Sequence, residues 1–213
     1  MIDLALRERI VATARRMNAL GINQGASGNV SARVEGGFLV TPSGIPYDGL
    51  EPGDIVHVGM GGHATGHREP SSEWRFHRDI YATRPEAGAI VHTHSTFATT
   101  LACLGRAIPA FHYEVAFAGG SDIRCAPYRT FGTQELSDAA VAALEGRRAC
   151  LLAHHGAIAF GADLGDALRL ADKVEAMARL YWQAIQVAEP ALLDDAEMAR
   201  IVERFRHYGP RSG

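Results

Sequence analysis

Two histidines that are separated by one residue, His92 and His94, follow a short apolar run from Gly88 to Val91. If this run forms a buried strand, successive side chains point to opposite faces, and both imidazoles project from the same face. Two imidazoles on one rigid face can supply two ligands of a metal ion. An isolated pair of this kind usually combines one core and one surface histidine, so the metal-site hypothesis needs further ligands.

A second apolar run, Ala149 to Ala153, also predicts a buried strand, and His154 and His155 follow it directly. Because a sheet can bring two strand ends together, three imidazoles could meet there, with positions left for a carboxylate and a substrate. Such a set suits Zn²⁺ or another borderline divalent ion. Periodicity does not choose between His154 and His155. The other histidines have no ligand spacing and are expected on the surface or in the core: His57, His63, His67, His77, His112 and His207.

A carboxylate lies beside features that favour anion binding. Ser71 and Ser72 precede a run of helical periodicity that begins at Glu73, so one of the two serines is the expected N-cap. The free N–H groups and the dipole at a helix start favour a phosphate. Glu73 also has a simpler explanation, because acidic residues stabilise the first helical turn. Two loops, 25–29 and 42–44, contain glycine and serine and could present backbone N–H groups to an anion.

Composition suits a single domain over 1–213. The chain has 213 residues, of which 47% are hydrophobic, and its formal net charge is -3. This charge gives no reason to expect nucleic acid or an anionic membrane as a partner. The charged start of the chain, Met1 to Arg9, and the lack of a long apolar segment predict a cytoplasmic protein.

The numbers and positions of the cysteines and lysines argue against a disulfide framework and against Schiff-base catalysis. Cys103, Cys125 and Cys150 are odd in number and widely spaced, so we expect small buried apolar residues and no disulfide framework. Lys173 is the one lysine among 21 basic residues, and it lies in a long predicted helix. Schiff-base catalysis requires a lysine in the pocket. A metal ion acting as a Lewis acid therefore fits this chain better.

The elements that must position these residues can be read from periodicity and turn residues. Helices are predicted over 2–20, 73–84, 96–104, 133–144 with Thr133 as N-cap, 163–188 and 194–205. Strands are predicted over 54–58, 89–91 and 149–153, with a hairpin over 29–41 and an extended segment over 157–160. The segment from Phe111 to Gly119 fits neither pattern, and the tail from about residue 207 is expected to be mobile.

Six ordered motifs together resemble the class II aldolase/adducin family, from about Arg7 to Tyr208. The motifs are Asn23-Gln24-Gly25, Gly28-Asn29-Val30-Ser31, Thr41-Pro42-Ser43-Gly44, Pro70-Ser71-Ser72-Glu73-Trp74, His92-Thr93-His94 and His154-His155-Gly156. The resemblance implies an α/β fold in which helices cover both faces of a central mixed, largely antiparallel β-sheet. It also implies a homotetramer whose active sites lie between subunits.

The resemblance implies a role for each matching residue. His92, His94 and His155 would bind Zn²⁺, with Co²⁺ or Mn²⁺ as alternatives, and Glu73 would be both a ligand and the acid/base. Tyr113 matches a proton donor from the neighbouring subunit, Phe131 a pocket wall, and Tyr208 a tail residue that closes over the substrate. The phosphate would be held by Gly28, Asn29, Ser43, Gly44, Ser71 and Ser72. Between Gly25 and the pair Gly28-Asn29, Ala26 replaces a hydroxyl residue that is often found in the family, which removes one potential hydrogen-bond donor near the phosphate.

The expected activity is the reversible cleavage of a ketose 1-phosphate into dihydroxyacetone phosphate and a small aldehyde. The substrate could be L-fuculose 1-phosphate, or a 5-deoxy- or 5-methylthioribulose 1-phosphate, because all three share the phosphate and carbonyl end. Two sister activities stay open, the 4-epimerisation of a pentulose 5-phosphate and the dehydration of methylthioribulose 1-phosphate. A non-catalytic adducin-like binding module is a further alternative, although such a module has no need of the metal ligands that this chain keeps.

Overall fold

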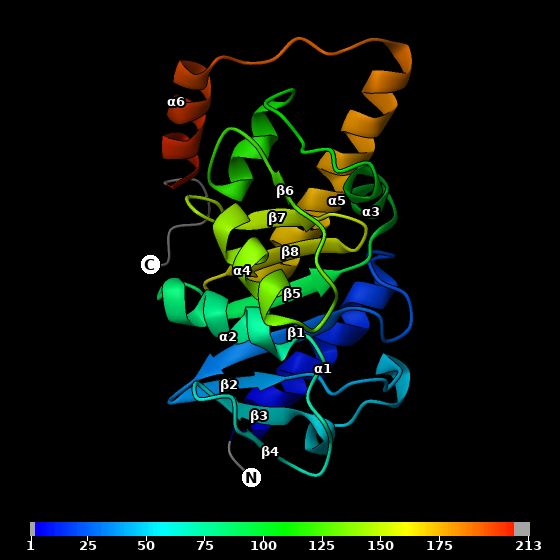
Figure 1. Ribbon diagram of the computed structural model, residues 1–213, viewed down its shortest axis with the longest axis vertical. Coiled ribbons are helices and arrows are strands. Elements are labelled where there is room, and N and C mark those ends of the chain that lie inside the picture. The colour runs from blue at the N-terminus through cyan, green and yellow to red at the C-terminus, as the bar shows by residue number, and fades with distance from the viewer. Residues whose placement is uncertain (1–2, 207–213) are drawn as a thin grey trace.

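One eight-stranded sheet runs through the protein in the order β4-β3-β2-β1-β5-β8-β7-β6 (Figure 1). The computed structural model describes residues 3–206. Neighbouring strands pair in antiparallel fashion except β6 and β7, which are parallel. The strands are β1 Asn29–Val34, β2 Gly37–Val40, β3 Val56–Gly59, β4 Ala64–Thr65, β5 Ala89–Thr93, β6 Arg124–Ala126, β7 Ala149–Leu152 and β8 Gly156–Gly161.

Helices cover both faces of this sheet. The helices α1, α3 and α5 pack on one face, while α2 and α4 pack on the other, so a hydrophobic core lies on each side. This arrangement confirms the expected fold class. The helices are α1 Leu4–Ala19, α2 Trp74–Thr83, α3 Thr96–Cys103, α4 Gln134–Ala143, α5 Leu164–Val187 and α6 Asp195–Arg206, and the short 3₁₀ helices are η1 Tyr47–Gly49, η2 Pro52–Asp54 and η3 Tyr113–Ala118.

Strand β5 lies at the centre of the sheet and is buried along its whole length. Ala89 and Val91 face the core beneath α1, α3 and α5, whereas Ile90 faces the core beneath α2 and α4. His92 continues the alternation on the side of Ile90, and its ring centroid lies 5.5 Å from that of Phe76 in α2. The strand alternation predicted for this segment is therefore confirmed, and it directs His92 towards α2.

The start of α2 differs from the prediction. Glu73, not a serine, occupies the N-cap position and makes no side-chain capping bond. The backbone N–H of Trp74 donates to the carbonyl oxygen of Ser71 at 3.0 Å, so a tight turn precedes the helix. The Ser71 hydroxyl accepts from the N–H of Glu73 at 3.3 Å, inside that turn. The expectation that Ser71 or Ser72 caps this helix is wrong, because the turn delays the first helical residue to Trp74.

The other predicted elements lie close to their positions in the structure, whereas strands β4 and β6 have no predicted counterpart. Thr133 caps α4 by accepting from the N–H of Leu136 at 3.3 Å, as expected. The strand predicted from residue 54 begins only at Val56, because Asp54 closes η2 by accepting from the N–H of Glu51 at 2.9 Å. The ambiguous segment around residue 115 forms η3, with His112 as its cap.

The three cysteines are free, but they do not share one environment. Cys150 is buried in β7 and Cys125 is half-buried, whereas Cys103 is exposed. The expectation that all three are buried is wrong for Cys103, because it is the last residue of α3 and lies at the surface. Among the described helices, none has the length and apolar character needed to cross a bilayer. The predicted tail and Tyr208 lie outside the described residues.

Candidate active site

The structure brings His92, His94 and His155 together at the C-terminal end of the central strand β5. His92 lies in β5, His94 follows that strand, and His155 lies in the turn between β7 and β8. The pairing of β5 with β8 places Thr93 opposite Ala157, so this turn lies beside the end of β5. The sequence left His154 and His155 as alternatives. His155 joins the cluster, while His154 packs against the Tyr128 ring at a centroid distance of 5.8 Å.

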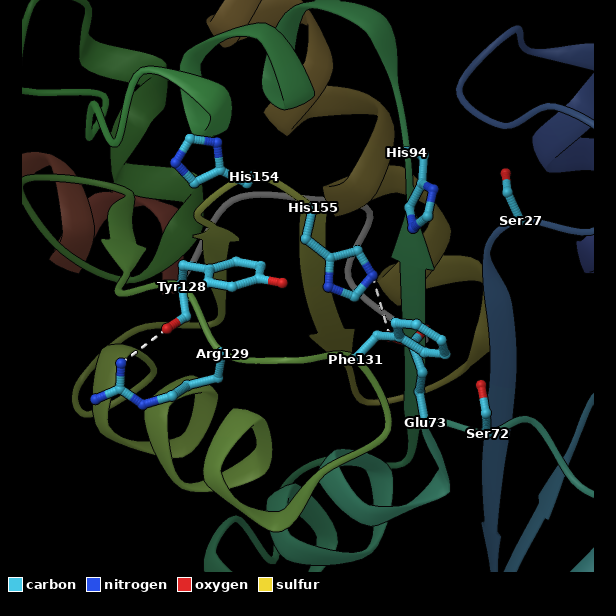
Figure 2. Close-up of a pocket in the computed structure, with 9 residues that line it drawn as sticks. All are labelled: Ser27, Ser72, Glu73, His94, Tyr128, Arg129, Phe131, His154 and His155. Carbon is cyan, nitrogen blue, oxygen red and sulfur yellow. Dashed lines mark hydrogen bonds and ion pairs between the residues drawn. The ribbon is translucent and has the colours of Figure 1, made fainter.

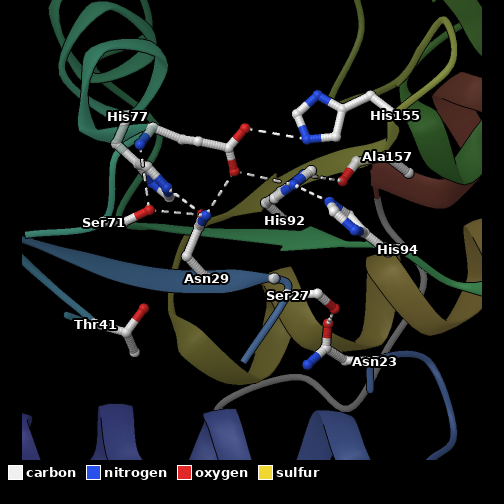
Figure 3. Close-up of polar contacts among 12 residues, drawn as sticks. Asn23, Ser27, Asn29, Thr41, Ser71, His77, His92, His94, His155 and Ala157 are labelled. Carbon is white, nitrogen blue, oxygen red and sulfur yellow. Dashed lines mark hydrogen bonds and ion pairs between the residues drawn. The ribbon is translucent and has the colours of Figure 1, made fainter. Parts of the chain in front are cut away.

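The three imidazoles converge on a common point (Figure 3). Their candidate ligand atoms all lie within 4.8 Å of one another. The ring centroids are 4.8 to 4.9 Å apart, with interplanar angles of 76 to 78°. Nδ1 of His92 lies 3.0 Å from the carbonyl oxygen of Ala157 and must donate to it, because a carbonyl only accepts. Nε2 of neutral His92 then carries a lone pair towards the cluster, as a metal ligand requires.

Glu73 completes the set from the start of α2. Its Oε2 lies 3.2 Å from Nε2 of His92, and its Oε1 lies 3.0 Å from Nε2 of His155. Oε1 is buried yet accepts no hydrogen bond, so the contact with His155 lacks hydrogen-bond geometry. A buried carboxylate oxygen without a donor is costly unless a cation neutralises it. Three imidazole nitrogens and one carboxylate therefore fit a divalent ion of the Zn²⁺ type.

The surroundings keep Glu73 ionised and His94 neutral, as a metal site needs. Burial alone would raise the pKa of the Glu73 carboxyl, but the neighbouring imidazoles of His92 and His155 lower it below its usual range. The pKa of His94 is lowered to about 4, first by burial and then by the charges of His92 and His155. Glu73 is therefore a carboxylate and His94 a neutral imidazole near pH 7.

Two glycines leave room for the histidines. A Cβ at Gly156 would overlap the backbone oxygen of Thr93 and lie 2.9 Å from Cδ2 of His94. A Cβ at Gly28 would overlap the backbone oxygen of His92 and lie 2.7 Å from Oδ1 of Asn23. Gly28 is one of the residues predicted to hold the phosphate, and the structure adds a packing reason for glycine at that position.

The segments predicted to hold a phosphate lie next to one another. Pro42 forms an isolated bridge with Pro70, so the loop of Ser43 and Gly44 lies beside the segment that leads to Ser71. Ser43 and Gly44 are exposed, whereas Ser71 is buried. The side-chain amide of Asn29 donates to Oγ of Ser71 at 3.0 Å and to Oε2 of Glu73 at 2.9 Å. Both side-chain N–H groups of Asn29 are therefore engaged within the protein.

A cavity of about 260 Å³ opens beside the cluster (Figure 2). Five predicted site residues line it, together with Ser27, Tyr128 and Arg129, which were not predicted from the sequence. In Figure 2 the loop with Tyr128 and Phe131 borders the cavity on the side away from Ser27. The full lining consists of Ser27, Ser72, Glu73, His94, Tyr128, Arg129, Phe131, His154 and His155.

Tyr113 and Lys173 lie away from this cavity. Tyr113 is 49% exposed, and its ring stacks on that of Phe205 at 6.2 Å in the same chain. Nζ of Lys173 forms an ion pair with Oε1 of Glu114 at 3.0 Å and lies over the Phe117 ring. A Schiff base at Lys173 would therefore form outside the cavity that holds the histidines.

His77 is the residue near the site that sequence reasoning undervalued. It was expected only on the surface or in the core, and it is fully buried beneath Asn29. Burial, followed by the charge of His92, lowers the pKa of His77 to about 3. Its spacing of four residues from Glu73 across the start of α2 was the signal available in the sequence, because such residues share a helix face.

Comparison with known proteins assigns the family. A model of the class II aldolase and adducin N-terminal domain matches residues 8–182, and the chain belongs to this family. The 5-methylthioribulose-1-phosphate/5-deoxyribulose-1-phosphate aldolase of Rhodospirillum rubrum is 55% identical over 206 residues, which cover 97% of this chain and 93% of the relative. The L-fuculose phosphate aldolase of Escherichia coli strain K12 is 48% identical, with 97% of this chain and 96% of the relative covered. A solved structure of an L-fuculose 1-phosphate aldolase has a TM-score of 0.92 at 38% identity, with 97% of each chain covered. The family resemblance of the motifs is confirmed.

Proposed function

We propose that this chain is a metal-dependent aldolase that reversibly cleaves a ketose 1-phosphate into dihydroxyacetone phosphate and a small aldehyde. The observation that carries the proposal is the Glu73 carboxylate, buried against His92 and His155 with Oε1 accepting no hydrogen bond. The names of the relatives at 48% and 55% identity support this class of substrate. Zn²⁺ is the metal that we expect at the site, with Co²⁺ or Mn²⁺ as substitutes.

The protein supplies the site around that metal. His92, His94 and His155 would hold it through their lone pairs, together with Glu73 in the resting state. When bound, a divalent ion provides Lewis-acid stabilisation of the negative charge that develops on a substrate carbonyl oxygen. The hydrogen bond from Nδ1 of His92 to Ala157 fixes the direction of one lone pair before the substrate arrives.

Glu73 would also move the proton that the reaction requires. Cleavage of the bond between C3 and C4 leaves an electron pair on C3 of the three-carbon fragment, and a positioned acid must protonate that carbon. Glu73 lines the cavity and lies next to the histidines, so one group serves as metal ligand at rest and as acid/base during turnover.

The phosphate group would bind where three segments meet, at Gly28 and Asn29, at Ser43 and Gly44, and at Ser71 and Ser72. Support comes from the bridge between Pro42 and Pro70 and from the hydrogen bond between Asn29 and Ser71. Backbone N–H groups and hydroxyls can hold a phosphate without a lysine.

The proposed active site is shared between the subunits of a homotetramer. Tyr113 does not line the cavity of its own chain, which supports its assignment to the site of a neighbouring subunit in a homotetramer. There it would exchange the proton of the C4 hydroxyl while Phe131 forms a wall for the aldehyde fragment. Tyr208 would close over the substrate. Each subunit would act as one domain over 1–213 in the cytoplasm.

The central test replaces Glu73 by glutamine. We expect Glu73→Gln to lower kcat for cleavage by about 10²- to 10⁴-fold, the usual contribution of a positioned acid/base. Formation of dihydroxyacetone phosphate would be measured with the zinc-loaded protein. Glu69→Gln is the matched control, because Glu69 is exposed and only four residues away. Normal cleavage by the Glu73→Gln protein would refute the assignment.

A panel of substrates separates the activities within the family. Ketose 1-phosphates with different aldehyde halves would be compared by kcat/KM, because that ratio measures discrimination in the transition state. An aldolase releases an aldehyde, whereas an epimerase gives an isomerised product without aldehyde. A dehydratase gives a product that lacks one water. The preferred aldehyde follows from the same measurements.

A further inference from the structure

A chain of buried polar side chains runs from the interior of the protein to Glu73. Its members are Tyr81, Ser31, His77, Asn29 and Glu73, and none is more than 5% exposed. The Tyr81 hydroxyl lies 2.8 Å from Oγ of Ser31, which lies 2.7 Å from Nδ1 of His77. Nε2 of His77 lies 2.5 Å from Oδ1 of Asn29, and Nδ2 of Asn29 lies 2.9 Å from Oε2 of Glu73.

The direction of every hydrogen bond in this chain follows from Glu73. An ionised carboxylate can only accept, so the amide of Asn29 must present its nitrogen to Glu73 and its oxygen to His77. Nε2 of His77 must then carry the proton, and Nδ1 must accept from the hydroxyl of Ser31. The Ser31 oxygen is left to accept from the Tyr81 hydroxyl. Only one tautomer of neutral His77 satisfies both of its neighbours.

We infer that His77 is a positioning residue for the reaction. Its Nε2–H group fixes the Asn29 amide so that one N–H of Asn29 always faces Oε2 of Glu73. Oε1, the oxygen nearer His155, is thereby kept free of hydrogen bonds for the metal and for the proton. The inference rests on the proposed function of Glu73 and deepens it by naming what orients the carboxylate.

Without His77, Oδ1 of the Asn29 amide loses its donor, and only the contacts with Ser71 and Glu73 still hold the amide. Rotation of the amide by half a turn would present Oδ1 to the carboxylate, and two acceptors facing each other at 2.9 Å repel. Glu73 would then have to move away from the position in which it faces His92 and His155. A residue that only fills the core would not orient Asn29. A positioning role and a packing role for His77 therefore predict different properties for matched variants.

Two substitutions at His77 separate these roles. The amide of glutamine reaches the position of Nε2, so His77→Gln can still donate to Asn29. The shorter asparagine places its amide near the position of Nδ1, so His77→Asn keeps a partner for Ser31 but loses the donor to Asn29. Ile80→Val is the control for core packing, because Ile80 is fully buried in the same helix and lies outside the chain of hydrogen bonds.

The first measurement is the affinity of the metal-free proteins for Zn²⁺, determined by competition with a chelator. We expect His77→Asn to bind Zn²⁺ about 10- to 100-fold more weakly than the wild type, the usual effect of losing a partner behind a metal ligand. The kcat for cleavage should fall by a similar factor, because Glu73 is both metal ligand and acid/base in the proposed function. His77→Gln should recover most of both losses, and Ile80→Val should match the wild type.

The second measurement reads the tautomer without using activity. In the ¹⁵N NMR spectrum of the metal-free and zinc-loaded proteins, His77 should show a protonated Nε2 and an unprotonated Nδ1. A proton on Nδ1 would overturn the inference. If His77→Asn does not fold, Ser31→Ala replaces it. Without the Ser31 hydroxyl, Nδ1 of His77 loses its donor and the tautomer is no longer fixed, so both Zn²⁺ affinity and kcat should fall.

The outcomes distinguish this inference from the proposed function. A wild-type protein that neither binds Zn²⁺ nor cleaves a ketose 1-phosphate would overturn the proposed function, and the inference with it. A wild-type protein that does both, with a His77→Asn variant equal to it, would overturn the inference alone. Equal losses in His77→Asn and His77→Gln would also overturn it, because they would indicate a structural role only.

Discussion

At the residue scale, burial sets the protonation of two histidines near the candidate metal site. The pKa of His77 is lowered from 6.5 to about 3, and that of His94 to about 4, with burial as the largest cause for both. Between these values and 6.5 the unfolded chain binds protons that the folded protein does not. The free energy of unfolding therefore rises with pH in this window, and folding stability is lost as the pH falls through it.

His77→Gln should make folding stability less sensitive to acid. For each histidine that stays neutral in the folded protein, the free energy of unfolding falls by about 1.4 kcal/mol per pH unit below the pKa of the unfolded chain. Urea unfolding of the metal-free proteins at pH 7, 6 and 5 should show a shallower decline for His77→Gln than for the wild type. His57→Gln serves as the control, because His57 is only half-buried in β3. Parallel declines in the wild type and His77→Gln would contradict the role given to burial.

The metal ligands could be predicted from the sequence because strand alternation is a local property. His92 and His94 share a face through their spacing alone, and the end of a second strand supplied the third histidine as a pair of candidates. Local periodicity could not choose between His154 and His155, because the choice depends on the turn between β7 and β8. His154 has a φ of 56° there, and such left-handed backbone turns its side chain away from the cluster.

At the element scale, the two helix starts that carry hydroxyl residues differ in function. Thr133 caps α4 with its side chain, whereas the serines before α2 make no such cap. Ser72 is exposed and lines the cavity. The stability of α4 therefore depends on its hydroxyl, while Ser72 is available for substrate.

Substitution by alanine should separate these functions. Thr133→Ala should lower the free energy of unfolding by about 1 kcal/mol, the usual cost of a lost N-cap. Ser72→Ala should change it by less than about 0.5 kcal/mol, as for other surface positions, but should raise KM for the ketose 1-phosphate. Urea unfolding and steady-state kinetics measure the two effects. A large stability loss in Ser72→Ala with KM unchanged would show that Ser72 supports the helix after all.

The starts of helices are harder to predict from the sequence than the helices themselves. The hydrophobic periodicity of α1 and α5 predicted both helices, because each buries one stripe against the sheet. The start of α2 was misplaced because a serine before an amphipathic run can either cap the helix or form a turn. The backbone hydrogen bond from Trp74 to Ser71 shows that the chain forms the turn. This turn lets Ser71 and Glu73 both accept from Asn29, which is more than 40 positions away, and local sequence patterns do not predict such contacts.

At the scale of the whole molecule, the proposed sharing of Tyr113 between subunits has a direct test. Glu73→Gln and Tyr113→Phe variants should each cleave poorly when assembled alone. If each site takes Glu73 from one subunit and Tyr113 from another, co-assembled variants should contain sites with both native residues, about a quarter of the total in a symmetric ring of equal composition. Co-expression followed by an activity assay measures this recovery. No activity beyond that of the separate variants would place Tyr113 and Glu73 in the same subunit or outside a common site.

The single lysine makes this protein unusually simple to label. An amine-directed reagent has one side chain to attack, Lys173 of α5, which is about a third exposed and lies outside the cavity with the histidines. Its ion pair is with Glu114, the residue that follows Tyr113 in η3. A fluorophore attached there would mark one defined position beside the segment that carries Tyr113. Once the more reactive N-terminal amine has been blocked, the rarity of lysine provides an optical probe of η3 without any engineered cysteine.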